Sequence, residues 1–177
     1  MGRAMRRILA VALVAAATAG AAGQQLPGGA SSVRETFEDW QLICESREGA
    51  AVCAISQALR QQDSQQLVLA VELIPASPDM AGGTVVMPFG LRLPEGVAMG
   101  IDDRSRSAAQ PFSTCLPVGC IVPVVFETEA LAALRGGAVL TLSAVVEESG
   151  DALDMQVSLK GFSAAYERAL VLGGDRG

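Results

Sequence analysis

Short stretches in which apolar and polar residues alternate run along most of the chain, and a period of two is typical of β-strands with one buried face. Trp40, Leu42 and Cys44 fall on one side of such a stretch, and the alternation returns over residues 51–55. A polar turn centred on residues 48–49 separates the two stretches, so they are predicted to form a hairpin. As the only tryptophan in the chain, Trp40 is expected to anchor the hydrophobic core.

Further apolar runs predict more strands. Residues 67–74 are apolar at almost every position, which indicates a central strand buried on both faces, and Pro75 and Pro78 are expected to end it. About nine short strands, with turn residues every ~8 to 12 positions and no long helical pattern, predict an all-β fold, an antiparallel β-sandwich. The other predicted strands lie at residues 84–87, 91–93, 97–101, 112–115, 120–126, 139–147 and 153–159.

Two short helices are predicted in the second half of the chain. Thr128 is placed to cap a helix that runs to residue 134, and Gly136 follows as a stop signal. Residues 162–170 place apolar side chains at helical spacing on one face, which favours a helix packed on the edge or end of the sandwich. The last residues, 171–177, are expected to fray.

The N-terminus has the features of a secretory signal peptide. Residues 1–23 begin with arginines, continue as an apolar run too short to span a membrane, and end in small residues. Residues 24–36, which begin with Gln, Pro, Gly, Ala and Ser, are predicted to form a flexible tether. One sandwich domain is then expected over residues 37–170.

The four cysteines form two pairs with hairpin spacing. An even-length turn at residues 48–49 brings Cys44 opposite Cys53, and a turn between Cys115 and Cys120 brings those two opposite each other. Cysteines facing each other across antiparallel strands are close enough for a disulfide, and an exported protein meets the oxidising conditions that preserve one. The sequence favours these two local bridges, although four cysteines allow two other connectivities.

The loop between Cys115 and Cys120 is the candidate partner-contact site. Leu116, Pro117 and Val118 form its tip, and Pro117 stiffens it, so that little conformational entropy is lost on binding. The alternative is that Leu116 and Val118 fold back and cover the end of the sandwich, because isolated apolar side chains need no binding role.

The chain is acidic, with 19 acidic residues, 13 basic residues and a formal charge of −6. Residues 1–23 hold three of the basic residues and none of the acidic ones, so the charge after their removal is −9. Nucleic acid and anionic lipid surfaces bind proteins through counter-charge that this chain lacks, which argues against both as partners. The expected partner is a protein, and no direct membrane span is predicted.

Catalytic chemistry is not indicated. The chain contains no histidine, which removes the most common general base, the usual nucleophile pairs and most zinc and copper sites. No nucleotide-binding loop and no Cys-x-x-Cys motif is present, so no catalytic residue, metal site or cofactor is predicted. The alternative is a thiol–disulfide enzyme that uses Cys115 and Cys120, but no helix N-terminus or cation is expected beside them to activate a thiolate.

Several segments together resemble the invasion-associated locus B family. Trp-x-x-x-Cys at residues 40–44 is followed by Cys53, and Pro-Phe-Ser-Thr-Cys-Leu-Pro-Val-Gly-Cys stands at residues 111–120. Ala-Leu-Ala-Ala-Leu-Arg-Gly-Gly and Val-Ser-Leu-Lys-Gly-Phe-Ser-Ala-Ala follow at residues 130–137 and 157–165. The resemblance covers most of the chain.

This resemblance implies an immunoglobulin-like β-sandwich exported to the periplasm or outer envelope of a Gram-negative, alphaproteobacterial cell. Some pathogenic members of the family are linked to entry into host cells. The resemblance therefore implies a non-enzymatic envelope protein that interacts with another protein or with a host surface, with a periplasmic structural or chaperone-like factor as a further alternative. The chain departs from the family pattern around residues 56–66, which are unusually rich in Gln.

Overall fold

The computed structural model describes residues 26–102 and 106–174, which form an all-β sandwich of two antiparallel sheets with two α-helices. This is the fold class that the strand periodicity predicts. The larger sheet has the spatial order β1 (Ser32–Phe37), β2 (Trp40–Arg47), β3 (Ala50–Arg60), β4 (Leu67–Ser77), β5 (Met80–Met87), β8 (Gly119–Glu127) and β7 (Thr114–Leu116). The smaller sheet has the order β10 (Ala152–Ser158), β9 (Val139–Val145) and β6 (Ala98–Ile101). The helical elements are α1 (Thr128–Gly136), α2 (Phe162–Gly173) and the short 3-10 turns η1 (Pro27–Gly29) and η2 (Leu93–Glu95).

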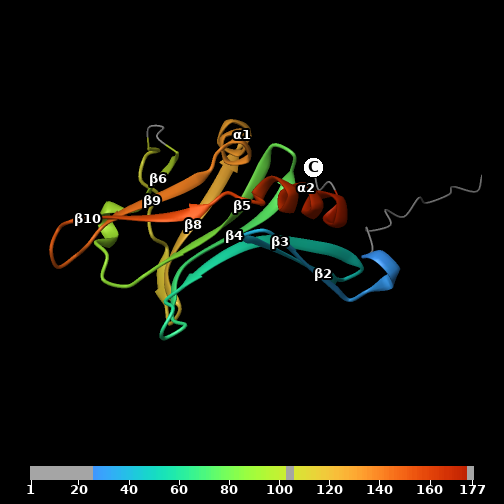
Figure 1. The fold of residues 1–177 in the computed structure, drawn as a ribbon, viewed down its shortest axis with the longest axis horizontal. Helices are drawn as coiled ribbons and strands as arrows, with labels where there is room; N and C mark the ends of the chain where they lie inside the picture. The colour runs from blue at the N-terminus through green and yellow to red at the C-terminus, as the bar shows by residue number, and fades with distance from the viewer. Residues whose placement is uncertain (1–25, 103–105, 175–177) are drawn as a thin grey trace, which may run out of the picture.

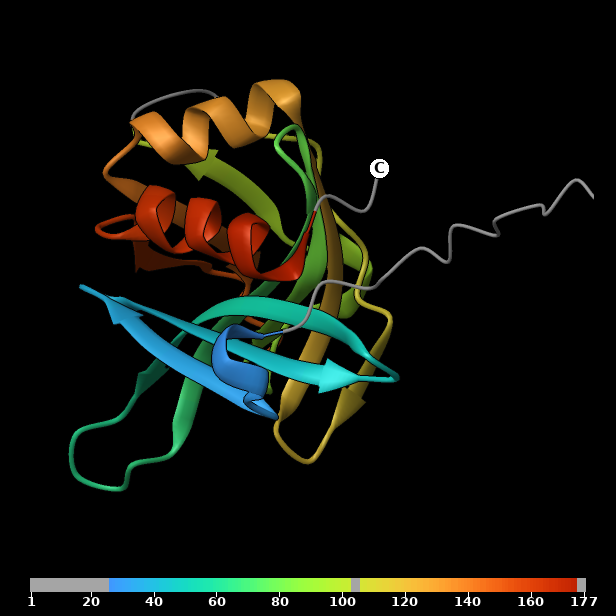
Figure 2. The ribbon, with the colours of Figure 1, turned by 90° about the vertical axis from the view of Figure 1, so that its right-hand side faces the viewer.

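The two sheets and α2 enclose one hydrophobic core. The seven-stranded sheet forms an arch, and α2 and the three-stranded sheet lie on the same side of it (Figure 1). Helix α2 packs on β2, β3 and β4, and α1 lies beside it at one end of the molecule (Figure 2). Within the described residues, no helix or strand lies over the opposite side of the seven-stranded sheet.

Local sequence fixes the β2–β3 hairpin. Its turn residues Glu48 and Gly49 both have positive φ, 53° and 83°, which is the backbone conformation of the tight turns that suit the twist of paired strands. Arg47 and Ala50 close the turn as the last pair of the ladder. The register predicted from the sequence is therefore the one observed.

Trp40 anchors the core, as its place in the apolar pattern predicts. The side chain is 1% exposed, and its indole N–H donates a hydrogen bond to the carbonyl of Ser158, 2.9 Å away. The edge of its ring meets Phe162 at a centroid distance of 5.1 Å, and Phe162 lies 5.7 Å from Tyr166. This row of aromatic rings joins α2 to β2 and carries much of the apolar area that holds the helix in place.

The prediction of a tether over residues 24–36 is wrong for its last part, because β1 begins at Ser32 and pairs along its whole length with β2. Alternate residues of β1 are half-buried on the side that faces α2. There Glu35 accepts hydrogen bonds from the guanidinium of Arg168, at 2.8 Å for the shortest contact. A strand with so few apolar side chains is supported mainly by distant residues, which local periodicity does not reveal.

The C-terminal helix is longer than the sequence predicts. Helix α2 continues to Gly173, and Leu172 is buried in the core, so the predicted fraying of residues 171–177 is wrong for this first part. Residues 175–177 lie outside the described residues, as does the predicted signal peptide at residues 1–23.

Strand β4 is covered on one face only, which contradicts the prediction of burial on both. Leu69, Val71 and Leu73 point into the core and are buried, whereas Ile74 is exposed on the other side. The strand also continues past Pro75, where a shift in register accommodates a residue without an N–H group. Strand β4 therefore carries more apolar side chains than this single chain buries.

Candidate interaction surface

Both cysteine pairs form local disulfides within hairpins. Cys44 of β2 lies opposite Cys53 of β3, with α-carbons 4.0 Å apart, and both side chains are buried. Cys115 of β7 lies opposite Cys120 of β8, with α-carbons 3.9 Å apart, and only Cys120 is buried. The first bridge therefore belongs to the core, whereas the second closes a hairpin at the edge of the sheet.

Leu116, Pro117 and Val118 lie at the tip of this β7–β8 hairpin. Leu116 pairs with Gly119, so only two residues form the loop between them. Leu116 is 49% exposed and Val118 is 58% exposed, so neither side chain folds back to cover the end of the sandwich. The turn requires glycine at position 119, because φ is 140° and a Cβ would lie 2.5 Å from the carbonyl oxygen of Met87.

The outer face is defined here as the side of the seven-stranded sheet that points away from α2 and the core. Register places apolar residues in a row across it. Ile43 of β2 lies opposite Ala54 of β3. Ile74 of β4 lies opposite Gly82 of β5, which in turn lies opposite Val125 of β8. Apolar surface therefore runs across the strands from β2 to β8.

Many side chains on the outer face are apolar. Of the eight large apolar side chains that are exposed in the described residues, four lie there: Ile74, Met80, Leu116 and Val125, at 38%, 47%, 49% and 66% exposed. A fifth, Val118, lies at the adjoining tip. The apolar set is Ile43, Val52, Ala54, Ala70, Ile74, Met80, Val86, Leu116, Ile121, Pro123 and Val125. The solvated face of an antiparallel sheet is normally polar, and a large exposed apolar patch usually marks a contact site.

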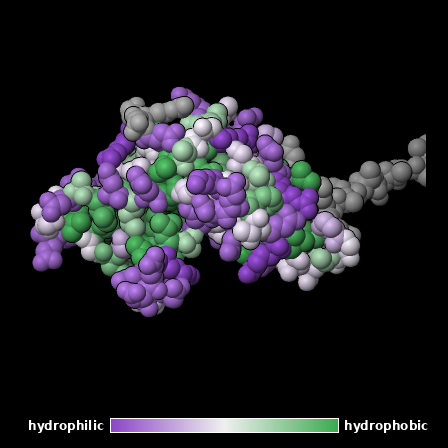
Figure 3. Space-filling model, viewed as in Figure 1, coloured by the Kyte–Doolittle hydropathy of each residue, from purple (hydrophilic) through white to green (hydrophobic). Residues whose placement is uncertain are grey.

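The outer face is hollowed over β2, β3 and β4. This depression has a volume of about 280 Å³, and it is lined by the apolar residues Ile43, Val52, Ala54 and Ile74 and by the polar residues Glu45, Arg47, Ser56 and Glu72. An indentation is visible along the lower edge of the molecule, and apolar side chains reach the surface beside it (Figure 3). A concave surface of this mixed composition fits a protruding part of a partner better than it fits a flat one.

Charged groups also lie on the outer face, where register places Arg34 opposite Ile43 and Glu127 opposite Met80. Glu72 of β4 lies beside Ser56 of β3 and Thr84 of β5, and it forms no ion pair with any described residue. Glu45 and Arg47 form an exposed ion pair, 2.9 Å apart, which contributes little to stability. The hollow therefore combines apolar side chains with Ser56, the Glu45–Arg47 ion pair and the unpaired carboxylate of Glu72.

Two other polar clusters hold elements together on the remaining surface. The Arg168 guanidinium lowers the pKa of Glu35 below its usual value by hydrogen bonding to both carboxylate oxygens. The pKa of Asp154 is lowered as well, first by the hydroxyl of Ser143, which donates over 2.6 Å, and then by Arg106, 2.7 Å away. Each cluster is internally satisfied, and it links neighbouring strands or a helix to a strand.

The described part of the chain contains no group of three or more side chains that is placed to hold a metal ion. Its helices are all too short or too polar to cross a membrane. Both reactive-thiol candidates, Cys115 and Cys120, are in strands and not at a helix N-terminus, where thiolates are stabilised.

Sequence reasoning identified the hairpin tip but missed the outer face. The signal was present, because residues 67–74 are apolar on both faces while the chain offers covering elements for only one. Counting helices and strands against the apolar faces that they must cover would have pointed to this surface.

Comparison with known proteins relates the chain to one family. Residues 40–170 match the family described as invasion associated locus B (IalB) protein. An invasion protein B homolog of Brucella abortus strain 2308 is 35% identical over 164 residues, which cover 93% of this chain and 94% of that protein. Invasion protein B of Bartonella bacilliformis is 34% identical over 146 residues, covering 81% of this chain and 77% of the relative.

A solved structure shows the same fold. The crystal structure of invasion associated protein b from Bartonella henselae superimposes with a TM-score of 0.73 at 31% sequence identity. The match covers 79% of this chain and 96% of the other. The sequence match over residues 40–170 includes both disulfide hairpins, and the structural match covers most of both chains.

Proposed function

Because the chain belongs to the invasion-associated locus B family, we propose that it is an exported, non-enzymatic protein that binds another protein through its outer face. The observation that carries this proposal is the apolar surface across β2 to β8, which no element of the described chain covers. The hairpin tip of Leu116, Pro117 and Val118 forms one border of the proposed contact area.

The apolar composition of the outer face supports a partner of comparable chemistry. Burying apolar surface stabilises a complex by roughly 25 cal/mol per Å², so side chains such as Ile74 and Val125 are favourable contacts once water is excluded. Keeping them exposed is costly for solubility and offers no benefit to the isolated sandwich. A protein that covers the outer face would explain why β4 carries a sequence suited to burial on both sides.

The charge of the chain supports a protein partner over a lipid surface or a nucleic acid. The formal charge is −6 for the full chain, and Glu72 adds a carboxylate at the centre of the proposed contact area. Anionic lipid head groups and phosphates would be repelled there. The hollow near Ile43 and Ile74 is suited to receiving a protruding side chain or segment.

The place of action that fits this proposal is the periplasm or the outer cell envelope. Two disulfides and a predicted signal peptide suit an oxidising, exported environment. Relatives named invasion protein B, from Brucella and Bartonella, suggest that the partner belongs to the envelope or to a host surface.

Site-specific crosslinking in intact cells tests the proposal. A photoreactive amino acid is placed at Val125 or Leu116, and at Gln156, an exposed control on the outward side of the three-stranded sheet. Discrete protein adducts at the first two positions and none at the control are expected. Equal adducts at all three positions, or none at Val125 in a correctly exported protein, would contradict it.

The thiol–disulfide alternative rests on the exposure of Cys115 at the sheet edge. An exchange enzyme needs an attackable sulfur, and this one is accessible. Its partner Cys120 is buried, however, and neither residue lies at a helix N-terminus. A structural bridge that stiffens the hairpin tip agrees better with these positions.

A further inference from the structure

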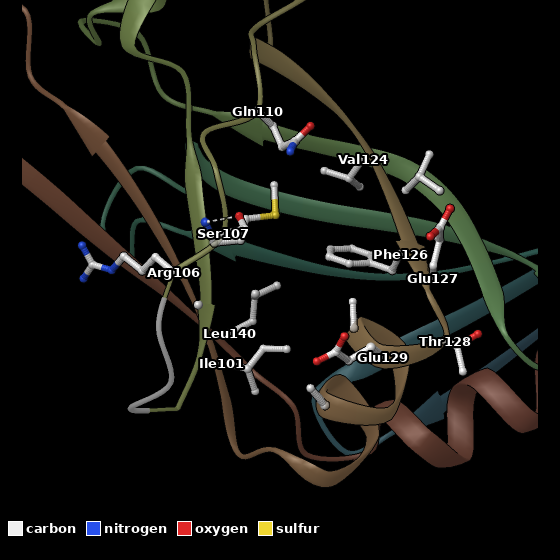
Figure 4. Close-up of a pocket in the computed structure, with 15 residues that line it drawn as sticks. Ile101, Arg106, Ser107, Gln110, Val124, Phe126, Glu127, Thr128, Glu129 and Leu140 are labelled. Atoms are coloured by element: carbon white, nitrogen blue, oxygen red, sulfur yellow. Dashed lines mark hydrogen bonds between the residues drawn. The ribbon is translucent and has the colours of Figure 1, made fainter.

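A groove separates the edges of the two sheets. It lies between β6 and β8, with α1 at one end and residues 106–110 along one side, and it has a volume of about 850 Å³ (Figure 4). Small-molecule sites in proteins usually enclose about 300 to 1,000 Å³, so the groove is large enough for a ligand. It borders the surface proposed above for protein binding, because Val125 of β8 belongs to both.

The groove exists because the short strand β6 does not pair with β8. The edge of β6 is instead occupied by residues 107–110: the N–H of Ser107 donates to the carbonyl of Met99 over 2.7 Å, and Val97 and Gln110 bond each other in both directions. These bonds satisfy the strand edge, so the space between the sheets is not closed by a ladder of hydrogen bonds. Side chains alone form its walls.

These walls are apolar. Phe126 and Val124 of β8 face Ile101 of β6 across the groove, and Leu140 of β9 contributes to its floor (Figure 4). Met99 of β6 also lines the groove. Apart from Ile101, these side chains are at most 7% exposed, so the floor of the groove is continuous with the core. An apolar chain would therefore enter surroundings from which water is already largely excluded.

Helix α1 leaves room at the end of the groove. It turns Ala130 and Ala133 toward this space, while its larger residues Leu131 and Leu134 are buried in the core. Ala132, the neighbour of Ala133, is exposed and does not line the groove. Small side chains on α1 thus determine how much of the groove remains open.

The polar groups in the groove point to the charge of its ligand. The Glu129 carboxylate projects between Ile101 and Phe126, and it forms no hydrogen bond or ion pair with another described residue (Figure 4). Arg106, on the opposite side, is neutralised by Asp154 at 2.7 Å. The unpaired charges that the described residues place in the groove, those of Glu127 and Glu129, are therefore both negative.

We propose that this groove binds a single hydrocarbon chain that carries a cationic head. The chain lies along the apolar walls formed by Phe126 and Met99, and the head pairs with the carboxylate of Glu129. A chain with an anionic head would meet repulsion at Glu129 and find no free cation among the described groove residues. An uncharged head is tolerated but gains no ion pair.

Three probes with the same chain and different heads test the proposal: dodecylammonium, dodecanol and dodecanoate. Binding to the folded protein is measured by isothermal titration below the micelle concentration of each probe, and chemical shifts of the alanine methyl groups locate the site. One molecule of dodecylammonium per protein is expected, at about tenfold higher affinity than dodecanoate, because attraction to the carboxylate is replaced by repulsion. Dodecanol should fall between the two.

Matched variants separate the groove from the rest of the acidic surface. Ala133→Leu fills the groove and should weaken binding about tenfold, whereas Ala132→Leu on the same helix should leave it unchanged. Glu129→Gln should reduce the preference for the ammonium head by about fivefold, and Glu167→Gln on α2 should not. Circular dichroism verifies that each variant is folded.

The proposal is overturned if no saturable one-to-one binding of dodecylammonium occurs, or if dodecanoate binds as tightly. It is overturned as well if Ala132→Leu weakens binding as much as Ala133→Leu, or if the methyl shifts appear only away from the groove. Saturable binding that is lost only in the groove-filling variant supports it.

Discussion

Single residues fix the position of α2 on the sheet. The hydroxyl of Tyr166 bonds the carbonyls of Ser77 and Met80, at 2.8 and 2.9 Å, and so ties the helix to the turn between β4 and β5. Burial raises the pKa of this phenol, and the nearby Arg135 guanidinium opposes that effect. Gly161 begins the helix with φ of 83°, a conformation that only glycine adopts without strain. The helix therefore depends on a few positions with strict requirements.

Gly161→Ala should be strongly destabilising. A Cβ at this position would overlap the carbonyl oxygen of Phe37, and the positive φ is itself unfavourable for alanine. We expect a loss of at least about 2 kcal/mol in the free energy of unfolding, measured by urea denaturation. Gly136→Ala is the matched control, because nothing lies within 4 Å of a Cβ there, and it should change stability by less than about 1 kcal/mol. Equal effects would show that backbone contact at Gly161 is unimportant.

The ion pair between Glu35 and Arg168 should make stability depend on pH in the acid range. Because the folded-state pKa of Glu35 is lowered from its usual 4.5, the pair stabilises the protein above that pH. The contribution is lost as the pH falls through the lowered value. Glu35→Gln should therefore be less stable at neutral pH and lose less stability on acidification, as measured by urea denaturation from pH 7 to pH 3.

The exposed carboxylate of Glu148 provides the control for that measurement. Glu148→Gln should keep the acid dependence of the parent protein. If Glu35→Gln shows the same slope as the parent, the ion pair does not contribute to the acid sensitivity of the fold.

At the scale of elements, the two disulfide hairpins differ in what they support. The Cys44–Cys53 bridge lies in the core between β2 and β3, beneath α2. The Cys115–Cys120 bridge holds the short strand β7, which has only three residues and lies at the edge of the sheet. One bridge therefore stabilises the whole domain, and the other keeps a terminal hairpin in shape.

Replacing each pair with alanine should separate these roles. Chain entropy predicts a loss of about 2 to 3 kcal/mol for each bridge, and loss of Cys44 and Cys53 should cost more because it also leaves unfilled space in the core. Urea denaturation measures both effects. Reduction potentials below about −300 mV are expected for structural bridges, and a distinctly higher value for Cys115–Cys120 would favour the thiol–disulfide alternative.

At the scale of the whole molecule, the fold has more apolar surface than it covers. Helix α2 and the three-stranded sheet both lie on one side of the arch, and the outer face remains open (Figure 1). The long strands β4 and β5 extend under both covering elements, so their outward side chains form one continuous surface. A partner on the outer face would convert the two-layer fold into a three-layer assembly.

The hairpin tip should contribute to this contact without supporting the fold. Leu116→Ser combined with Val118→Ser should leave the melting temperature within about 2 °C, because both side chains are exposed, but should reduce crosslinking from Val125. The control Val171→Ser replaces an exposed valine on α2, on the other side of the sheet, and should preserve crosslinking. A large loss of stability in the tip variant would instead assign the two side chains a packing role.

The sequence by itself determined the features that depend on neighbours along the chain. Alternation identified most strands, although it missed β1 and predicted a strand at residues 91–93 where the structure has none, and turn residues set the hairpin registers that bring Cys44 to Cys53 and Cys115 to Cys120. The register within a hairpin is fixed by the local turn and by the two-residue period of the strands, so it can be predicted from the local sequence alone. The apolar pattern of β4 is visible in the sequence as well, but the sequence does not show that one face of this strand stays uncovered.

Only the tertiary structure decided which faces are covered, because that depends on contacts between distant residues. Arg168 reaches Glu35 across 133 positions, and Trp40 bonds the carbonyl of Ser158 across 118. Such contacts place α2 and the small sheet on one side of the arch and leave the groove beside α1. They also hold residues 32–37, whose sequence resembles a tether, as strand β1. Local periodicity cannot report them, since closing long loops depends on the packing energy of the complete core.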